Sequence, residues 1–383
     1  MIPYGRQDVS EIDVQAVVDV LRSDFLTQGP QVPKFEKAIA QYCGVEHAVA
    51  VNSATSALHI ACLALGVGPG DLVWTSPITF VASANCALYC GGEVDFIDIN
   101  PSTANIDVIQ LEKKFIAAKS ANRLPKVLVA VHLSGASCEM AKIHTLCQSF
   151  GVKIIEDASH AIGGKYQGSP VGSCRYSDIT VFSFHPVKII TTAEGGLATS
   201  KSAELARKMN LLRSHGITRD ESEMTHASDG PWYYQQVELG FNYRLTEIQA
   251  ALGLAQMGRL DAFVQRRHEL ARRYDEAFNQ LPLHLPVVSE GVYSALHLYI
   301  IRLNNGQNHL QVFNQLRILG VGVNLHYIPV YLQPYYAKMG FRPGYCPNAE
   351  TFYGTAISIP MYSALTEADQ NQVIAAVKQV VTH

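Results

Sequence analysis

The sequence predicts an α/β protein built on a mainly parallel sheet with helices on both faces, followed by a smaller α+β unit. Between about residues 45 and 200, six short β-rich runs alternate with helical patterns, which is typical of parallel strands joined by helical crossovers. Runs such as KVLVAVHL (126–133) are apolar on both alternations, as expected for strands buried on both faces. The chain of 383 residues is about two to three times the usual domain size, so a second unit fits.

The predicted elements follow in order along the chain. Ser10 and Asp13 open an amphipathic helical pattern with the spacing of a capped helix start, and the turn-rich residues 27–30 end it. Six predicted strands come next, at 47–53, 71–76, 93–99, 126–133, 152–158 and 178–184. This order predicts that the main sheet is complete by about residue 200.

The C-terminal part has a different pattern. One long helical stretch runs from Thr246 to about Leu281, and Gln249 stands at capping-box spacing from Thr246. Beyond it, the runs 297–303 and 321–330 and a terminal helix from about Glu367 indicate a compact α+β unit. We therefore expect a large domain over residues 1–245 and a small C-terminal domain, including the long linking helix, over residues 246–383.

Composition excludes several classes of protein. Hydrophobic residues make up 48% and charged residues 16%, which suits a well-buried enzyme. The net charge of −3 gives no general attraction to nucleic acid or to an anionic membrane, and no stretch reaches the roughly 18 apolar residues of a membrane span. Eight cysteines without CxxC pairs or cysteine–histidine clusters indicate reduced thiols and no metal site. We expect a cytoplasmic protein that binds neither nucleic acid nor membrane.

Two polar residues stand where predicted strands end. Asp157 closes the apolar run 152–158, and Lys188 follows the run 178–184, so both side chains could meet at one edge of the sheet. A desolvated lysine is driven towards the neutral amine, which can form an imine with an aldehyde. An aspartate facing a pyridine nitrogen keeps that nitrogen protonated and makes the ring an electron sink. Taken singly, Lys188 also suits a solvated loop and Asp157 a helix N-cap.

A third segment could hold an anion. The run 47–53 leads into a helical pattern, whose free N–H groups and the hydroxyls of Thr55 and Ser56 form an anion site without a lysine. Such hydroxyls are often only caps. Phe80 could stack on a flat ring or fill the core, and His326 and Tyr327 stand in predicted loops. Patterns typical of metalloproteases, α/β-hydrolases and P-loop kinases do not occur in the sequence.

Taken together, five segments resemble the sugar-nucleotide aminotransferases of the DegT/StrS group. They are NSATSALH, TFVAS, EDASHAIGG, FSFHPVKIITTAEGG and LGFNYRLTEIQAALG, in that order across most of the chain. The resemblance implies the fold type I (aspartate-aminotransferase-like) architecture and pyridoxal 5'-phosphate as cofactor. FHPVK with ITTAEGG and DGPWYYQQVELGFNYR is most similar to enzymes that aminate C4 of a UDP-linked 4-keto-6-deoxy-N-acetylhexosamine in pseudaminic acid biosynthesis.

The resemblance also implies roles for individual residues. Lys188 matches the Schiff-base lysine, Asp157 the partner of the pyridinium nitrogen, and His160 the group lying against the cofactor ring. The other implied cofactor contacts are Thr55, Ser56 and Ser183 at the phosphate, Phe80 at the ring, and Asn242 reaching the phosphate from the neighbouring subunit of a homodimer. The implied substrate contacts are Tyr4, Leu26, Thr27, Gln28, Gly29, Asn324, His326 and Tyr327. Related enzymes usually have proline after the lysine, where this chain has Ile189.

The predicted reaction is a ping-pong transamination from glutamate to a nucleotide-linked keto sugar, in which Lys188 carries a proton between the amino-acid Cα and the cofactor. Three alternatives stay open. The substrate could be another nucleotide-linked 4-keto or 3-keto deoxysugar. A dehydratase of the same fold would carry histidine in place of the lysine, which Lys188 argues against. A regulatory or sugar-binding homologue without activity would not need the lysine, the aspartate and the anion site together.

Overall fold

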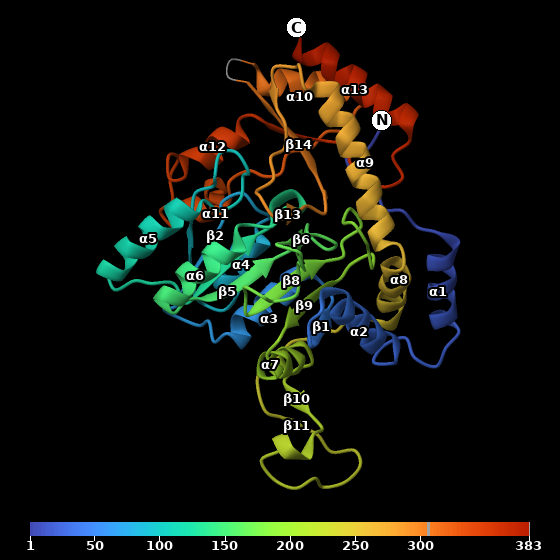
Figure 1. Ribbon diagram of the computed structural model, residues 1–383. Coiled ribbons are helices and arrows are strands. Elements are labelled where there is room, and N and C mark those ends of the chain that lie inside the picture. Colours follow the sequence, from blue (N-terminus) through green and yellow to red (C-terminus); the bar gives the residue numbers. More distant parts are fainter. Residues whose placement is uncertain (305–306, 383) are drawn as a thin grey trace.

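The computed structural model describes residues 1–304 and 307–382, and a seven-stranded sheet dominates it (Figure 1). Its order is β1-β9-β8-β5-β4-β2-β3. All six predicted strands are present, as β1 (His47–Val51), β2 (Leu72–Thr75), β3 (Glu93–Phe96), β4 (Val127–Val131), β5 (Lys153–Asp157) and β8 (Ile179–Ser183). From β3 to β8 all neighbours pair in parallel, which confirms the mainly parallel sheet. The seventh strand, β9 (Gly196–Ser200), was not predicted, and it lies antiparallel between β1 and β8.

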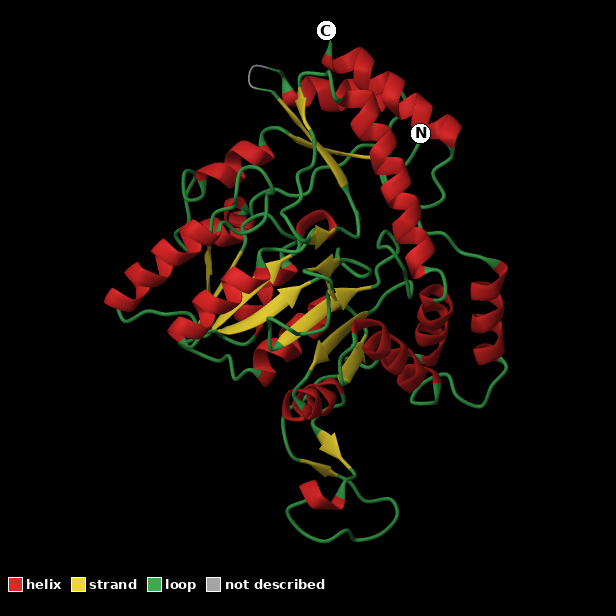
Figure 2. Ribbon diagram, viewed as in Figure 1, coloured by secondary structure: helices red, strands yellow, loops and turns green. Residues whose placement is uncertain are grey.

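Helices cover both faces of the sheet (Figure 2). One alternation of strand residues, including Val73, Val129 and Ile155, packs against the first group of helices, and the other alternation, including Leu128 and Ile154, packs against the second. The first group is α3 (Ala54–Ala64), α4 (Ala82–Tyr89) and α7 (Ala203–Arg213). The second is α5 (Val108–Ser120) and α6 (Met140–Phe150), with α2 (Gln31–Cys43) at the β1 end. The strands have continuous apolar sequences because both faces of the sheet are buried.

The N-terminal helix α1 (Glu11–Leu21) begins with the predicted cap, because the Ser10 and Asp13 side chains each accept from the other's backbone N–H. Its predicted apolar face is not buried in this chain, since Val14 is 44% and Leu21 56% exposed. The buried residues of α1 are Val20 and Asp13, and Arg259 and Gln256 hold the Asp13 carboxylate at 2.5 and 2.8 Å.

The long helix predicted from Thr246 to about Leu281 is two helices, α8 (Glu247–Met257) and α9 (Leu260–Phe278). Thr246 and Gln249 form the predicted capping box at the start of α8. Arg259 interrupts the helix because its backbone leaves helical geometry at φ −115°, ψ 1°, while its side chain binds Asp8 and Asp13. The break lets α8 pack against α1 and α2, and α9 continue towards α13 (Glu367–Val381).

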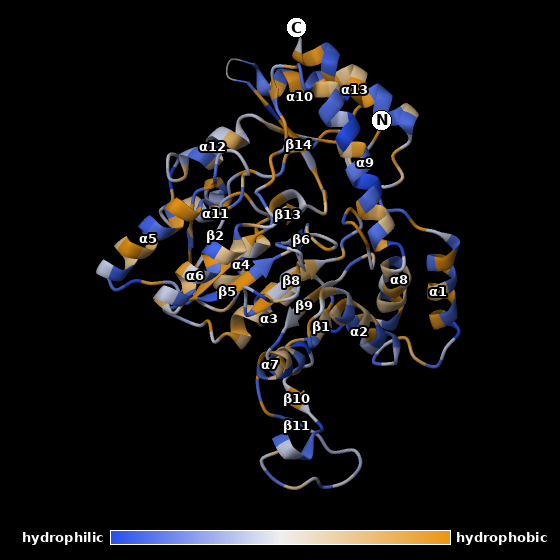
Figure 3. Ribbon diagram, in the orientation of Figure 1, coloured by the Kyte–Doolittle hydropathy of each residue, from blue (hydrophilic) through white to orange (hydrophobic). Residues whose placement is uncertain are grey.

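The C-terminal part contains a three-stranded antiparallel sheet in the order β12-β14-β15. The strands are β12 (Leu283–His284), β14 (Tyr299–Leu303) and β15 (Ala356–Ile359), and α10 (His309–Ile318), α13 and the far end of α9 share their core. α13 shows the alternating hydrophobic and hydrophilic residues of a half-buried helix (Figure 3). The predicted division between residues 245 and 246 stays a prediction, and His383 lies outside the described residues.

Several short elements complete the chain. A small antiparallel sheet, β13-β6-β7, consists of Val292–Tyr293, Lys165–Tyr166 and Ser169–Pro170. The helices α11 (Pro334–Ala337) and α12 (Pro347–Tyr353) precede β15. The hairpin β10 (Ile217–Thr218) and β11 (Gln235–Gln236) projects from the body beyond α7 (Figure 1). Across residues 1–304 and 307–382, a helix with the length and hydrophobicity needed to cross a membrane does not occur.

Candidate active site

A cavity of about 530 Å³ opens at the carboxyl ends of β5 and β8. This volume lies within the usual range for small-molecule sites. Ten of the predicted site residues line the cavity, from segments far apart in the chain: Tyr4, Thr55, Phe80, Asp157, His160, Ser183, Lys188, Asn324, His326 and Tyr327. The sheet edge therefore brings together the residues that the sequence motifs singled out.

Asp157, the last residue of β5, is buried on the floor of this cavity. One carboxylate oxygen accepts a 2.6 Å hydrogen bond from the Ser83 hydroxyl, which is itself within 2.7 Å of the Thr79 hydroxyl. The other oxygen accepts from the backbone N–H and the hydroxyl of Ser159, at 3.1 and 2.6 Å. These bonds fix the orientation of the carboxylate at the cavity, and the residues that follow Asp157 do not form a helix that it could cap.

Lys188 lies in the turn that follows β8 and lines the same cavity. Its backbone N–H donates to the His185 carbonyl at 2.9 Å, which closes the turn. Burial lowers the pKa of Lys188 to about 8, and the opposing effect of the Asp157 charge is smaller. Roughly a tenth of Lys188 is therefore neutral at pH 7, far more than for an unperturbed lysine, and the neutral amine is the state that attacks a carbonyl. The residue after it, Ile189, is buried in the apolar cluster that includes Phe182 and Phe184.

His160 forms one wall of the cavity. Its Nε2 atom is 3.2 Å from the Tyr327 hydroxyl, and the two rings are nearly parallel, with an 18° angle between them. Its ring centroid is 4.4 Å from that of His297. Burial, followed by the positive charge of Lys188, holds the pKa of His160 well below its usual value. A neutral imidazole therefore presents a flat surface against which an aromatic ring can stack.

An anion cradle lies where β1 meets α3. Ser53 caps α3 by accepting from the Ser56 N–H, and Thr55 in the first turn lines the cavity together with Ser183. The first turn of a helix supplies N–H groups that attract negative charge. Gly196 of β9 passes so close that a Cβ there would lie 2.4 Å from the Ala54 nitrogen. Ser56 does not line the cavity, because its hydroxyl donates to the Asn52 side chain at 2.7 Å.

Aromatic and polar groups surround the opening. Phe80 is 59% exposed, and its ring lies 6.5 Å from that of Tyr327. Tyr4 packs against His326 at 5.3 Å, and the Nδ1 atom of His326 is 2.8 Å from the Ser358 hydroxyl. Burial, and then the charge of Lys188, lowers the pKa of His326 to about 3. The opening is therefore lined by aromatic surface and hydrogen-bonding groups, with the Glu194 carboxylate also on the cavity lining.

Besides Ser56, five predicted site residues do not line this chain's cavity: Asn242, Leu26, Thr27, Gln28 and Gly29. Asn242 is exposed, and its carbonyl accepts from the Asn52 side chain at 3.5 Å. The turn 26–29 lies on the surface, where the buried Glu247 holds it by accepting the N–H groups of Gln31 and Val32. These residues therefore lie apart from the cavity of their own chain.

The match to a known family decides what the cavity belongs to. The family model of the DegT/DnrJ/EryC1/StrS aminotransferase family matches residues 7–378. The chain belongs to this family. A transaminase of Campylobacter jejuni that acts on UDP-4-amino-4,6-dideoxy-N-acetyl-beta-L-altrosamine is 38% identical over 96% of this chain and 94% of its own length. The GDP-perosamine synthase of Caulobacter vibrioides is 36% identical over 92% of this chain and 90% of its own.

Solved structures agree with this assignment. PseC of Helicobacter pylori, an aminotransferase in the biosynthesis of pseudaminic acid, matches 100% of this chain and 99% of its own with a TM-score of 0.90 and 32% identity. A sugar aminotransferase of Streptococcus pneumoniae in its pyridoxamine-phosphate form matches with a TM-score of 0.91 and 30% identity over 100% and 99% of the chains, and its pyridoxal-phosphate form is similar. The chain thus has the fold type I architecture and is a pyridoxal-phosphate-dependent aminotransferase.

The family's cofactor fits the residues present. The cradle at Thr55 and Ser183 suits a phosphate, the face of His160 suits a flat ring, and the fixed carboxylate of Asp157 suits a protonated ring nitrogen. Lys188 lines the same cavity with an amine whose pKa burial has lowered. The cavity therefore offers one group for each part of the cofactor.

Sequence patterns did not single out several residues that build the site, Ser53, Thr79, Ser83, Ser159 and His297, or Glu247, which holds the segment beside the turn 26–29. Ser83 and Ser159 lie inside the motifs TFVAS and EDASHAIGG, but the resemblance assigns no role to either serine. Their hydrogen bonds to Asp157 join residues 74 positions apart in one case, and strand or helix periodicity carries no information about such pairs. Glu247 looked only like the first residue of a capped helix.

Proposed function

We propose that this chain transfers an amino group from glutamate to C4 of a UDP-linked 4-keto-6-deoxy-N-acetylhexosamine, as a step in pseudaminic acid biosynthesis. The observation that carries the proposal is the shared cavity of Lys188 and Asp157, in a chain 38% identical along almost all its length to a transaminase named for that sugar. The lysine argues against the dehydratase alternative, and membership of an aminotransferase family argues against a protein without activity.

Each cavity residue has a distinct part in this proposal. The bound cofactor would supply a carbonyl for the incoming amine and an aromatic ring that accepts electrons. Thr55, Ser183 and the first N–H groups of α3 would bind its phosphate. Asp157 would hold the proton on the ring nitrogen, and His160 would support one face of the ring. Lys188 would first hold the cofactor covalently and then, once displaced by the amino donor, move the proton that the reaction transfers.

The substrate side is also assigned by this proposal. Tyr4, Asn324, His326 and Tyr327 line the cavity on the side of the C-terminal part, where a keto sugar would approach the cofactor. Neutral histidines and tyrosine hydroxyls suit sugar hydroxyl and N-acetyl groups, because they donate and accept hydrogen bonds without carrying charge. A second candidate is another nucleotide-linked keto deoxysugar, which the match to the GDP-perosamine synthase supports.

We further propose that the functional unit is a homodimer with shared sites. Asn242 and the turn 26–29 are exposed away from their own cavity, so only a second copy could present them to a site. The projecting hairpin and the segment that follows it carry exposed apolar side chains, including Trp232 at 73% and Leu239 at 78%. Such surface is typical of an interface.

An assay of purified protein with glutamate and a panel of UDP-, GDP- and dTDP-linked 4-keto sugars tests the function. We expect the highest kcat/KM with the UDP-linked 4-keto-6-deoxy-N-acetylhexosamine, and NMR of the product should show the new amine at C4. Highest activity with another nucleotide would favour the second candidate. A lack of amino transfer to every sugar would contradict the proposal.

A further inference from the structure

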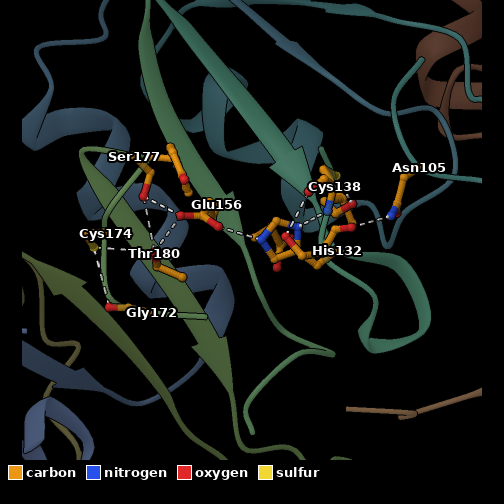
Figure 4. A network of polar contacts seen from close by, with 12 residues as sticks. Asn105, His132, Cys138, Glu156, Gly172, Cys174, Ser177 and Thr180 are labelled. Atoms are coloured by element: carbon orange, nitrogen blue, oxygen red, sulfur yellow. Dashed lines mark hydrogen bonds and ion pairs between the residues drawn. The ribbon is translucent and has the colours of Figure 1, made fainter. Parts of the chain in front are cut away.

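Glu156 directly precedes Asp157 on β5 and points to the opposite face of the sheet, because side chains alternate along a strand. It is buried at 6% exposure. One carboxylate oxygen lies 2.7 Å from the Nε2 atom of His132, the residue just after β4. The other oxygen accepts from the hydroxyls of Ser177 and Thr180, at 2.5 and 3.3 Å (Figure 4). The carboxylate therefore joins β5 to the segments on both sides of it.

The hydrogen bonds show which groups of this network donate a proton and which accept one. The backbone N–H of Cys138 donates to the Nδ1 atom of His132 at 3.2 Å, so the ring proton is on Nε2 and is donated to Glu156. Burial alone would raise the pKa of Glu156, but the hydrogen bonds from His132 and Ser177 outweigh it and lower that pKa. Glu156 is thus an ionised acceptor, and His132 is held from both sides.

The network meets the active site through the backbone. The N–H of His132 donates to the Asp157 carbonyl at 3.1 Å. In the sheet register Glu156 pairs with Thr180 and Asp157 with Val131 and Val181. His132 and Glu156 therefore hold β4, β5 and β8 in register at one edge of the sheet. Asp157 extends from this edge, and Lys188 lies just beyond it.

The same network supports the wall formed by His160. The turn after His132, stabilised by the bond from Cys138, contains Gly135 with φ +98°. A Cβ on Gly135 would lie 2.9 Å from the His160 carbonyl and 3.0 Å from the His297 nitrogen. This turn therefore packs closely against the backbone of both cavity histidines.

We propose that His132 and Glu156 form a positioning pair for amino transfer, which holds Asp157 and His160 at the geometry the cofactor requires. The proposal rests on the proposed function, because it assumes that Asp157 faces the cofactor's ring nitrogen. Site geometry must be held within about 0.5 Å to be productive. The ionised carboxylate of Glu156 and its hydrogen bonds provide this constraint from the face of the sheet opposite to Asp157. They do so without contacting a ligand.

Two substitutions of one residue test the proposal. In His132→Asn the amide oxygen can take the place of Nδ1 and keep the bond from Cys138, but contact with Glu156 is lost. His132→Gln can still reach Glu156 with its amide N–H and gives up the bond from Cys138. The readouts are the pH midpoint of the visible absorption of the pyridoxal-phosphate-loaded protein and the rate at which glutamate converts that absorption. The melting temperature, Tm, of each variant is measured alongside.

We expect His132→Asn to lower the rate by about tenfold or more, the lower end of the loss seen when outer-shell partners are removed at metal sites, and to move the pH midpoint. His132→Gln keeps its contact with Glu156, so its pH midpoint should stay near that of the wild type, and the loss of the Cys138 bond should lower the rate less than His132→Asn does. Equal effects of both variants, or a normal midpoint and rate in His132→Asn whatever its Tm, would overturn the proposal. If His132→Asn does not fold, Ser177→Ala removes one bond to Glu156 and should lower the rate in the same direction, and an unchanged rate would overturn the proposal. Lack of the lysine-dependent absorption in wild-type protein would contradict the proposed function instead.

Discussion

At the scale of single residues, the site depends on where charge is buried. Lys188 and Asp157 line the same cavity, yet burial lowers the lysine pKa more than the aspartate raises it. The aspartate is held by Ser83 and Ser159 instead of by the lysine. The sequence could predict both residues because each ends a recognisable strand. It could not predict the hydroxyl groups that orient Asp157, since they come from separate segments and have no periodic signal.

The lowered pKa of Lys188 predicts how the cofactor-free protein combines with pyridoxal phosphate as pH changes. Only the neutral amine reacts, so the rate should rise with pH and level off above about 8, where an unperturbed lysine would level off near 10.4. Stopped-flow absorbance over a pH series measures this rate. In Asp157→Asn the charge that raises the lysine pKa is gone, and the inflection should move to lower pH. An inflection at the pH of an ordinary lysine would contradict the assignment.

At the scale of elements, apolar runs predicted the six strands that are buried on both faces. β9 was not predicted because its sequence, GLATS, is short and begins with glycine, and its place between β1 and β8 depends on tertiary pairing. The break between α8 and α9 was also missed, because ion pairs from Arg259 to Asp8 and Asp13 lie about 250 residues apart in sequence. The capping boxes of α1 and α8 are local, and both were predicted correctly.

Gly196 gives a prediction at the same scale. Its Cβ in Gly196→Ala would overlap the Ser53–Ala54 peptide, so β9 or the start of α3 must shift and the phosphate cradle must distort. We expect the Kd for pyridoxal phosphate to rise by about tenfold or more, which corresponds to a loss of roughly 1.4 kcal/mol. Equilibrium titration measures this Kd. Gly68→Ala is the matched control, because nothing lies within 4 Å of its Cβ, and equal affinity of both variants would count against the cradle.

At the scale of the whole molecule, the exposed residues are as informative as the buried ones. Ile12, Val14 and Leu21 of α1 and Trp232 of the projecting hairpin are exposed within one chain, and Asn242 lies outside its own cavity. The sequence pattern predicted that α1 has an apolar face. It could not predict whether the same chain or a second molecule covers that face.

Mixing two inactive variants tests the shared site. If Asn242 serves the neighbouring subunit, a hybrid of Lys188→Ala with Asn242→Ala contains one site with both Lys188 and Asn242 intact. Activity should then return to roughly a quarter of the wild-type value when the chains exchange at random. Amino-transfer assays before and after refolding the mixture measure this, with each variant refolded alone as a control. If Asn242 acts within its own chain, the mixture should gain no activity.

The most direct test of the central claim identifies the lysine that holds the cofactor. Protein loaded with pyridoxal phosphate is reduced with sodium borohydride, digested, and analysed by peptide mass spectrometry. The arrangement of Lys188 opposite Asp157 predicts the pyridoxyl group on the peptide that contains Lys188, and none in Lys188→Ala. A label on a different lysine of the wild-type protein, or full labelling of the variant, would contradict it.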